Sequence, residues 1–217
     1  MVELTIPSEL LAQIQQTVIA CQPELSVTTA DELVILDGKF VVTGPKGPFD
    51  AYMVNIKVSS AFPWQEPIVV ETGDRIPKTI DRHIFPNTGR CCLGIWEEWL
   101  LTAPDHTFLT YLSGWLHDYF VSQTSFEAKG EWPYGERSHG DEGVNESYAE
   151  LLEVPNDATV ISDYLRLLAR SIAKGHTPCP CGSGKILRKC HRDSVAQLRA
   201  RIVPAMATRM LDRVSQK

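Results

Sequence analysis

The segment Glu32-Leu-Val-Ile-Leu-Asp-Gly-Lys-Phe-Val-Val-Thr43 decides the fold class of this 217-residue chain. Two runs of β-forming residues flank Asp37-Gly38, a dipeptide that suits a two-residue hairpin turn. Residues 51–58 alternate in character as a half-buried strand does, and a fourth short apolar run covers residues 68–71. Turn residues rich in glycine and proline separate these runs. The pattern predicts a sheet of four antiparallel strands connected as a meander.

Helices are expected on both sides of these strands in the sequence. Residues 8–22 repeat apolar side chains at helical spacing after Pro7, a residue that suits a first helical turn. A run of aromatic and aliphatic positions predicts a long buried helix over residues 107–121. Further helices are expected over residues 144–152, 159–173 and 194–214, the last with a kink at Pro204. Strands followed by helices indicate an α+β fold class.

The composition limits the class of protein. Apolar residues make up 43% of the chain, which excludes disorder as its default state. No stretch approaches the roughly 18 uninterrupted apolar residues of a membrane span, and the first residues lack the basic and apolar blocks of a secretory signal. The sequence therefore predicts a soluble, cytoplasmic protein. We expect a main domain over residues 1–155, a helical linker over 156–175 and a C-terminal region over 176–217.

The net charge of −6 conceals an asymmetry along the chain. Residues 1–165 contain nine Lys and Arg against twenty-five Asp and Glu, which gives −16, whereas residues 166–217 contain twelve against two, which gives +10. One interpretation is a solvated basic helix beside an acidic domain. The other is a basic tail that meets an acidic protein, nucleic acid or anionic lipid. Charge alone does not choose between them.

Two of the six cysteines, Cys91 and Cys92, are adjacent in an irregular segment. A cysteine thiolate on such a segment suits acyl transfer between thiols, provided that a donor for the oxyanion lies nearby. Asn87 lies just upstream, and His83 and Asp105 could approach from either side. Because neighbouring side chains of an extended chain point to opposite faces, the two thiols are not both expected to face outward.

The order of motifs along the chain resembles that of ubiquitin-conjugating enzymes. The string His83-x-Phe-Pro-Asn-x-Gly-x-Cys-Cys-Leu93 is preceded by Phe62-Pro63 and followed by Trp99. It matches in order the family's proline segment, His-Pro-Asn motif, catalytic cysteine segment and tryptophan. The resemblance covers roughly residues 5–121. It implies the family's fold, a four-stranded antiparallel meander with flanking helices, and makes the main domain a ubiquitin-conjugating-like catalytic domain.

The resemblance also implies roles for individual residues. Cys92 takes the position of the nucleophile that carries a protein C-terminus as a thioester, and Cys91 that of a small inward-facing core residue. Asn87 corresponds to the asparagine that supports the active-site loop or the oxyanion. His83 is interpreted as a residue that braces the loop, and Asp105 either faces the incoming amine or caps the following helix. The alternatives are Cys91 as nucleophile and an ordinary buried thiol at Cys92.

Some features depart from the eukaryotic members of the family. Asn87 lies closer to the cysteine, and Gly94 stands where aspartate is usual. These departures and the loop Trp132–Gly140 resemble bacterial members, which occur beside activating enzymes and ubiquitin-like proteins, or in CBASS antiphage systems beside cGAS-like nucleotidyltransferases. The resemblance implies that the donor is the C-terminus of one of these proteins, and that the acceptor is a lysine. The chain has no phosphate-loop motif, so an external activating enzyme or an unusually reactive donor is implied. His139 either lines the cleft or stabilises a turn.

Cys179, Cys181, Cys190 and His191 place four soft metal ligands within thirteen residues. Three thiolates and one imidazole form a tetrahedral zinc site with no open position, which is typical of structural zinc. The turn Gly182-Ser-Gly184 allows the chain to fold back between the ligand pairs. The string closely resembles the SEC-C motif, CxCGSGxxxxxCH, which implies a knuckle that binds one zinc ion. In related proteins the motif docks partners or surfaces, and the alternative is a loop with free thiols.

Three functions are consistent with these patterns. The leading hypothesis is a bacterial ubiquitin-conjugating-like acyltransferase with a zinc knuckle. One alternative is a catalytically inactive binding module with the same fold, which the presence of Cys92 disfavours. The other is an adaptor in which the basic zinc tail is the functional part. Nucleic-acid binding is disfavoured, because the knuckle lacks interleaved aromatic residues for base stacking.

Overall fold

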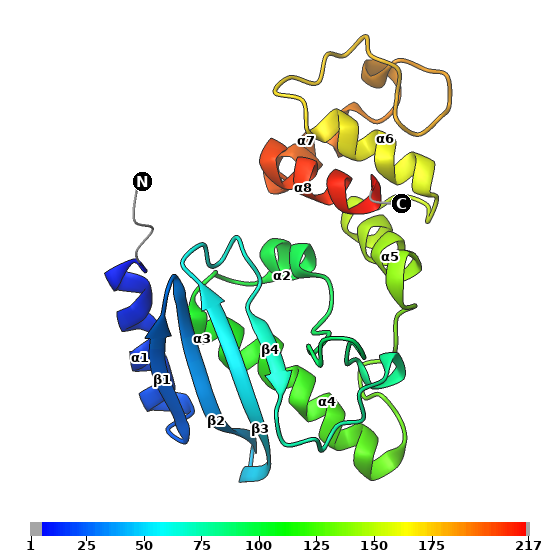
Figure 1. Ribbon diagram of the computed structural model, residues 1–217. Coiled ribbons are helices and arrows are strands. Elements are labelled where there is room, and N and C mark those ends of the chain that lie inside the picture. The colour runs from blue at the N-terminus through cyan, green and yellow to red at the C-terminus, as the bar shows by residue number, and fades with distance from the viewer. Residues whose placement is uncertain (1–5, 216–217) are drawn as a thin grey trace. The chain divides into compact units, whose positions relative to one another are not determined.

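The structure is a computed structural model that describes residues 6–215 (Figure 1). The chain divides into two compact units. The first contains the residues up to Trp96 together with Ala103–Glu136, and the second contains Glu97–Thr102 and the residues from Arg137 onward. The domain boundary expected after residue 155 falls inside the second unit. Residues 1–5 and 216–217, which the expected domains include, lie outside the described residues.

The first unit is built on a four-stranded sheet with the strand order β1-β2-β3-β4. Every neighbouring pair is antiparallel, so the predicted meander and the α+β class are confirmed. The fully buried side chains of β2 and β3 all stand at even-numbered positions, as expected for a sheet that is covered on one face. The strands are β1 (Leu25–Ala30), β2 (Leu33–Gly44), β3 (Gly47–Ser59) and β4 (Ile68–Glu71).

The turn predicted at Asp37-Gly38 is wrong, because β2 runs through this dipeptide without a break. Gly38 has a φ of +136°, and a Cβ atom there would lie 2.5 Å from the carbonyl oxygen of Glu24. The glycine therefore permits the close approach of the chain that enters β1, and it does not reverse the chain. The reversals lie at residues 31–32 and 45–46, and β1 is a strand that the sequence pattern does not predict.

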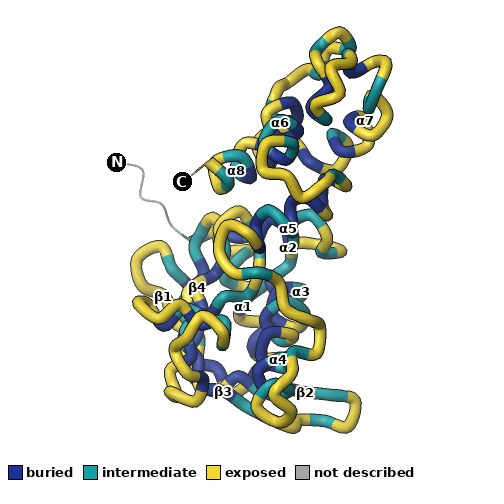
Figure 2. Tube along the Cα trace, turned by 90° about the vertical axis from the view of Figure 1, so that its right-hand side faces the viewer, coloured by how far each residue is buried: buried dark blue, intermediate teal, exposed yellow. Residues whose placement is uncertain are grey.

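Helices of the first unit cover one face of the sheet (Figure 1). The ring of Phe120 on α4 lies with its centroid 5.0 Å from that of Phe40 and stacks at 4.7 Å on Tyr52. Figure 2 shows buried positions along α4 and the strands that it faces. The predicted helices over residues 8–22 and 107–121 are confirmed, and the second continues to Lys129. The helical segments are α1 (Ser8–Cys21), a 3-10 turn (Ile80–Arg82), α3 (Phe108–Thr110), a π-helical turn (Tyr111–Trp115) and α4 (Leu116–Lys129).

The second unit consists of helices and loops, in which α6 packs against α5, α7 and α8. The single basic helix expected over residues 194–214 is two helices, because Pro204 has no backbone N–H to continue α7 and begins α8 instead. The helix expected to reach residue 173 ends at Leu168. Among the described residues, no helix combines the length and the apolar character that a bilayer crossing requires. The helices are α2 (Trp96–Thr102, whose first residue belongs to the first unit), α5 (Gly140–Leu152), α6 (Ala158–Leu168), α7 (Arg192–Arg201) and α8 (Pro204–Ser215), with a 3-10 turn over Leu187–Lys189.

Candidate functional site

The cysteine pair lies on a hairpin at the edge of the sheet in the first unit. The backbone N–H of Cys92 donates to the carbonyl oxygen of His83 over 2.7 Å, and that of Cys91 donates to the carbonyl oxygen of Val69 on β4 over 2.8 Å. An antiparallel bridge between Ile84 and Cys91 continues the ladder. The hairpin therefore extends the sheet beyond β4, and its extended backbone sends the two cysteine side chains to opposite sides.

The two thiols have different environments. Cys91 is 1% exposed, whereas Cys92 is half-buried, so the prediction that they are not presented in the same way is confirmed. Burial raises the pKa of Cys91 to about 12, which keeps this thiol protonated at neutral pH. Neither cysteine takes part in a disulfide. Because a nucleophile must be both accessible and ionisable, Cys92 is the better placed of the two.

His83 holds the hairpin against the neighbouring helix. Its carbonyl oxygen accepts hydrogen bonds from the N–H of Cys92 and, over 3.2 Å, from the hydroxyl of Tyr119. Its φ of +50° turns the chain at this point. Its imidazole lies edge-on to the ring of Trp132, with the centroids 4.7 Å apart, and its Nε2 is 3.9 Å from Glu136 Oε1. The hairpin is thus held through the backbone of His83, and the bracing role of its side chain stays a prediction.

Asn87 and His139, the two other polar candidates, are exposed. Asn87 lies at the tip of the cysteine hairpin, in a turn that is closed by a 2.8 Å hydrogen bond from the Gly89 N–H to the Phe85 carbonyl oxygen. Its side-chain amide forms no hydrogen bond with any residue between 6 and 215, so this structure gives it no bracing contact. His139 belongs to the second unit, where it directly precedes α5.

Asp105 holds the residue that caps the start of the long helix, Thr107. Its Oδ1 accepts hydrogen bonds from the backbone N–H of Thr107 over 2.9 Å and from the hydroxyl groups of Thr107 and Thr110 over 2.7 and 2.6 Å. The hydrogen bonds from Thr110 and Thr107 lower the pKa of Asp105. The N-cap itself is Thr107, whose hydroxyl oxygen accepts from the backbone N–H of Thr110 over 3.2 Å, so Asp105 supports the cap residue and does not itself cap the helix.

The four metal-ligand candidates, Cys179, Cys181, Cys190 and His191, come together in the second unit. Their ligand atoms all lie within 4.8 Å of one another. The sulfur atoms of Cys179 and Cys190 are each 3.3 Å from His191 Nδ1, and Cys181 Sγ is 3.6 Å from Cys190 Sγ. A zinc tetrahedron with ordinary bond lengths has edges of about 3.5–3.8 Å. The predicted ligand set is therefore close enough to hold a metal ion.

A short hairpin brings the ligands together. The backbone N–H of Cys179 donates to the carbonyl oxygen of Lys185 over 2.8 Å, which closes the loop that contains Cys181. Gly182 and Gly184 have φ values of +75° and +71°, a conformation that glycine adopts without a steric penalty. The glycines thus reverse the chain as predicted.

Ser183, between these glycines, contacts two of the ligands. Its Oγ lies 3.2 Å from Cys181 Sγ and 3.4 Å from Cys190 Sγ. The hydrogen bond with Ser183 lowers the pKa of Cys181 to about 6, whereas burial raises the pKa of Cys179 to about 11. Because metal binding requires thiolates, Ser183 favours the binding-competent form of Cys181. The sequence analysis attributes no such role to Ser183.

A buried ion cluster in the second unit is absent from the sequence-based predictions. Glu97 on α2 is 1% exposed and accepts hydrogen bonds from Arg209 Nε over 2.5 Å and Arg213 Nη1 over 3.1 Å. The Tyr148 hydroxyl donates to the same carboxylate over 3.2 Å. Burial disfavours ionisation of Glu97, but the two guanidinium groups outweigh it and lower its pKa. The four-residue spacing of the arginines on one face of α8 is the signal that could have indicated this cluster.

Comparison with known proteins adds no relative. No family model, no curated protein and no solved structure matches the chain.

Proposed function

We propose that the protein is a ubiquitin-conjugating-like acyltransferase that carries a protein C-terminus as a thioester on Cys92. This proposal rests on the difference in burial between two adjacent thiols. Cys91 is buried in the core, whereas Cys92 is half-buried on a hairpin that backbone hydrogen bonds attach to the sheet. The chain order of α1, four-stranded meander, cysteine hairpin and long helix also agrees with the proposed ubiquitin-conjugating fold.

The proposed reaction has two steps. The thiolate of Cys92 attacks the carbonyl carbon of a donor thioester, so that a new C–S bond forms and the donor's former thiol leaves as a thiolate. The amine of an acceptor lysine then attacks the same carbon, which forms an amide bond and returns the electron pair of the C–S bond to Cys92. The proton lost by the amine passes to solvent. The first step exchanges one thioester for another of similar free energy, so it needs no cofactor.

The residues around Cys92 position the thiol in this proposal. The backbone hydrogen bond from Cys92 to His83 fixes the hairpin, and Tyr119 on α4 holds His83 in turn. Asn87 is proposed to stabilise the oxyanion only when a substrate is bound beside the hairpin. Its side-chain amide forms no hydrogen bond within residues 6–215. We assign Asp105 to the support of Thr107, the N-cap residue of the long helix.

The donor and acceptor follow from the family resemblance alone. The proposed donor is the C-terminus of a ubiquitin-like protein or of a cGAS-like nucleotidyltransferase, in bacterial antiphage defence. An activating enzyme would form the first thioester, and the acceptor would be a protein lysine. The acidic balance of residues 1–165 favours partners with a basic contact surface.

We further propose that Cys179, Cys181, Cys190 and His191 bind one structural zinc ion. The donor set of three thiolates and one imidazole is typical of closed zinc sites, and the 3.3–3.6 Å separations fit around one ion. A bound zinc ion would stabilise the knuckle without taking part in the transfer reaction. These residues would hold together the hairpin, the 3-10 turn over Leu187–Lys189 and the start of α7.

The decisive test is the formation of a covalent adduct. The full-length protein is incubated with ATP and the ubiquitin-like, activating and nucleotidyltransferase proteins encoded beside it, and adducts are resolved with and without reductant. We expect a reductant-sensitive adduct for the parent chain, a reductant-resistant ester for Cys92→Ser and no adduct for Cys92→Ala. Cys91→Ser is the matched control and should still form the thioester. An adduct that survives Cys92→Ala would refute the assignment, and a folded chain that forms none would indicate an inactive binding module.

A second candidate function, an adaptor with a basic zinc tail, is favoured by one surface. Five basic residues of the knuckle region are exposed and form no ion pair within residues 6–215. They are Lys174, Lys185, Arg188, Lys189 and Arg192. Binding through such a surface must weaken steeply with salt, so a pulldown that is insensitive to salt would exclude an adaptor of this kind.

A further inference from the structure

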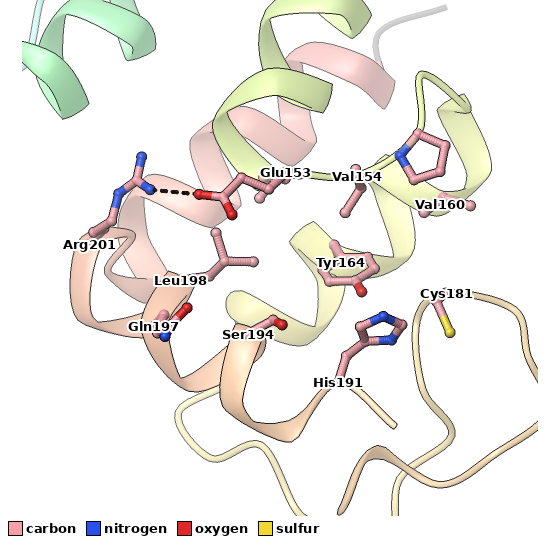
Figure 3. A pocket seen from close by; sticks show the side chains of 12 residues that line it. Glu153, Val154, Val160, Tyr164, Cys181, His191, Ser194, Gln197, Leu198 and Arg201 are labelled. Carbon is pink, nitrogen blue, oxygen red and sulfur yellow. Dashed lines mark ion pairs between the residues drawn. The ribbon is translucent and has the colours of Figure 1, made fainter. Parts of the chain in front are cut away.

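A pocket of about 500 Å³ lies in the second unit beside the metal-ligand cluster, and Figure 3 shows Cys181 and His191 among its walls. Glu153 and Arg201, the acidic and the basic side chain that line it, pair with each other at 3.5 Å. The walls therefore carry no unpaired carboxylate or guanidinium group that would identify a ligand, and we assign none to this pocket.

The sheet of the first unit places a lysine in the same row as Cys92. Lys57 on β3 pairs with Ile68 on β4. On the other side of β4, Val70 forms an antiparallel bridge with Arg90. Cys92 lies two residues beyond Arg90, so this register puts it opposite Ile68. Lys57, Ile68 and Cys92 thus lie side by side on three neighbouring segments of extended chain.

The three side chains share one face of the sheet, opposite to the face that the helices of the first unit cover (Figure 1). Lys57 is exposed and stands between two fully buried positions of β3. Ile68 is 41% exposed. Cys92 directly follows the buried Cys91 in an extended segment, so its side chain points to the opposite face. The lysine and the half-buried thiol therefore meet the same solvent space.

The side chains of Lys57 and Cys92 are long enough to meet above Ile68. Two strand spacings separate their backbones, which is about 10 Å. An extended lysine side chain holds its amine about 6 Å from the Cα atom, and the carbonyl carbon of a cysteine thioester lies about 4 Å from its own Cα atom. Rotation about side-chain bonds is therefore sufficient to bring the amine to this carbon, and the sheet need not change.

No carboxylate holds the ammonium group of Lys57 away from Cys92. Lys57 forms no ion pair within residues 6–215. By contrast, Lys39 pairs with Glu24 at 2.9 Å and Lys78 pairs with Asp74 at 2.8 Å. The hydrogen bond with Asp74 also raises the pKa of Lys78, which lowers the share of neutral amine at that residue. Of these three lysines in the first unit, Lys57 is the best acceptor for an acyl group on Cys92.

We propose that Cys92 transfers its acyl group to Lys57 of the same chain, which makes Lys57 a site of self-modification. The neutral amine attacks the carbonyl carbon of the thioester, a C–N amide bond forms, and the electron pair of the broken C–S bond returns to Cys92. The proton lost by the amine passes to solvent. The substrate is a thioester-bound carboxyl group, and the product is an amide that reductant does not release. This inference rests on the proposed function of Cys92 and adds an acceptor to it.

The test loads the full-length, zinc-loaded protein with a small acyl group, so that it needs no natural donor. The probe is the mercaptoethanesulfonate thioester of N-acetylglycine, added at pH 8. Peptide mass spectrometry locates the acyl group, and hydroxylamine distinguishes the thioester, which it cleaves, from the amide. We expect Cys92 to be labelled first, and the amide on Lys57 to appear later at a rate that does not change when the protein is diluted.

Three variants identify the route. Cys92→Ala should lower amide formation at Lys57 about tenfold or more, because the amine then meets the probe only from solution. Lys57→Arg keeps the charge of this exposed side chain, and the thioester on Cys92 should persist several times longer in it. Lys39→Arg is the matched control, at an exposed lysine on the same face of the sheet that pairs with Glu24, and it should behave as the parent chain does.

The remaining outcomes separate this inference from the proposed function. If Cys92 carries the probe but the amide forms on Lys78, on another lysine or not at all, self-modification of Lys57 is wrong, whereas the adduct assay with the natural donor still decides the transferase. The inference is also overturned if Cys92→Ala labels Lys57 as fast as the parent chain, or if amide formation slows in proportion to dilution. If neither the probe nor the natural donor labels Cys92, both proposals fail.

Discussion

The two cysteine groups of this chain show opposite uses of local backbone conformation. At Cys91 and Cys92, an extended ladder separates adjacent side chains, so that one thiol is buried and the other is half-exposed. In the knuckle, a tight turn gathers thiols that are nine or more residues apart, such as Cys181 and Cys190, to within 3.6 Å. Proximity in sequence therefore does not decide whether cysteines act together. The backbone between and around them does.

The largest expected effect is on the folding of the knuckle, through its cysteine ligands. Cys190→Ser, or removal of zinc with a chelator, should unfold the segment of residues 175–191, because structural zinc sites contribute on the order of 10 kcal/mol to folding. Metal content and backbone amide exchange of that segment measure the effect. Cys21→Ser, at an exposed cysteine, is the control and should keep its zinc. A knuckle that retains its protection from exchange without metal would contradict a metal-dependent fold.

The separated cysteines should differ strongly in reactivity. With a pKa of about 12, Cys91 is ionised to about 10⁻⁴ at pH 8, against about a tenth for a thiol with the ordinary pKa of 9.0. Iodoacetamide should therefore modify Cys92 completely before Cys91 reacts. The two residues share one tryptic peptide, so fragment ions must locate the label. Equal labelling of both cysteines in the folded protein would show that the two thiols do not differ in accessibility and ionisation.

The buried thiol should also make stability depend on pH. Because the pKa of Cys91 is raised on folding, the folded state holds its proton above pH 9 while the unfolded state releases it, and stability falls as pH rises from about 9 towards 12. Cys91→Ala should cost about 1–2 kcal/mol at pH 7 through the cavity that it leaves. The difference in free energy of unfolding between the parent chain and the variant should be smaller at pH 10 than at pH 7, by about 1.4 kcal/mol. Urea unfolding at both pH values checks it, and a constant difference would contradict the argument.

The smallest effect tests the serine inside the knuckle. Ser183→Ala removes the hydroxyl that contacts Cys181 and Cys190, so the ligands should ionise less readily and zinc affinity should fall about tenfold. The pH at which half of the zinc is released should rise accordingly. Competition with a chromogenic chelator between pH 5 and 8 measures both quantities. Ser171→Ala, at an exposed serine outside the knuckle turn, is the control.

Features that depend on short-range pattern could be predicted from the sequence. Helical spacing predicts α1, strict alternation predicts β3, and the density of soft ligands predicts the metal cluster around Cys179. The opposite burial of Cys91 and Cys92 also follows from the geometry of any extended chain. In each case neighbouring residues contain the whole signal.

Features that depend on distant contacts could not be predicted. Asp37-Gly38 has the local character of a turn, but the approach of Glu24 makes it part of a strand. Glu97 meets Arg209 across more than a hundred residues, and no local pattern indicates that pairing. The tip position of Asn87 depends on how the hairpin pairs with β4, and sequence order alone does not fix it.

The junction within α2 has a practical consequence for anyone who dissects this molecule. The indole of Trp96 donates to the carbonyl oxygen of Pro63 in the first unit, whereas the next residue, Glu97, is held by arginines of the second. The chain passes between the units after residues 96, 102 and 136, so no single cut releases either one intact. A fragment that stops at Glu136 would carry an orphaned acidic side chain five residues beyond Cys92, and activity lost in such a fragment would say nothing about the knuckle itself.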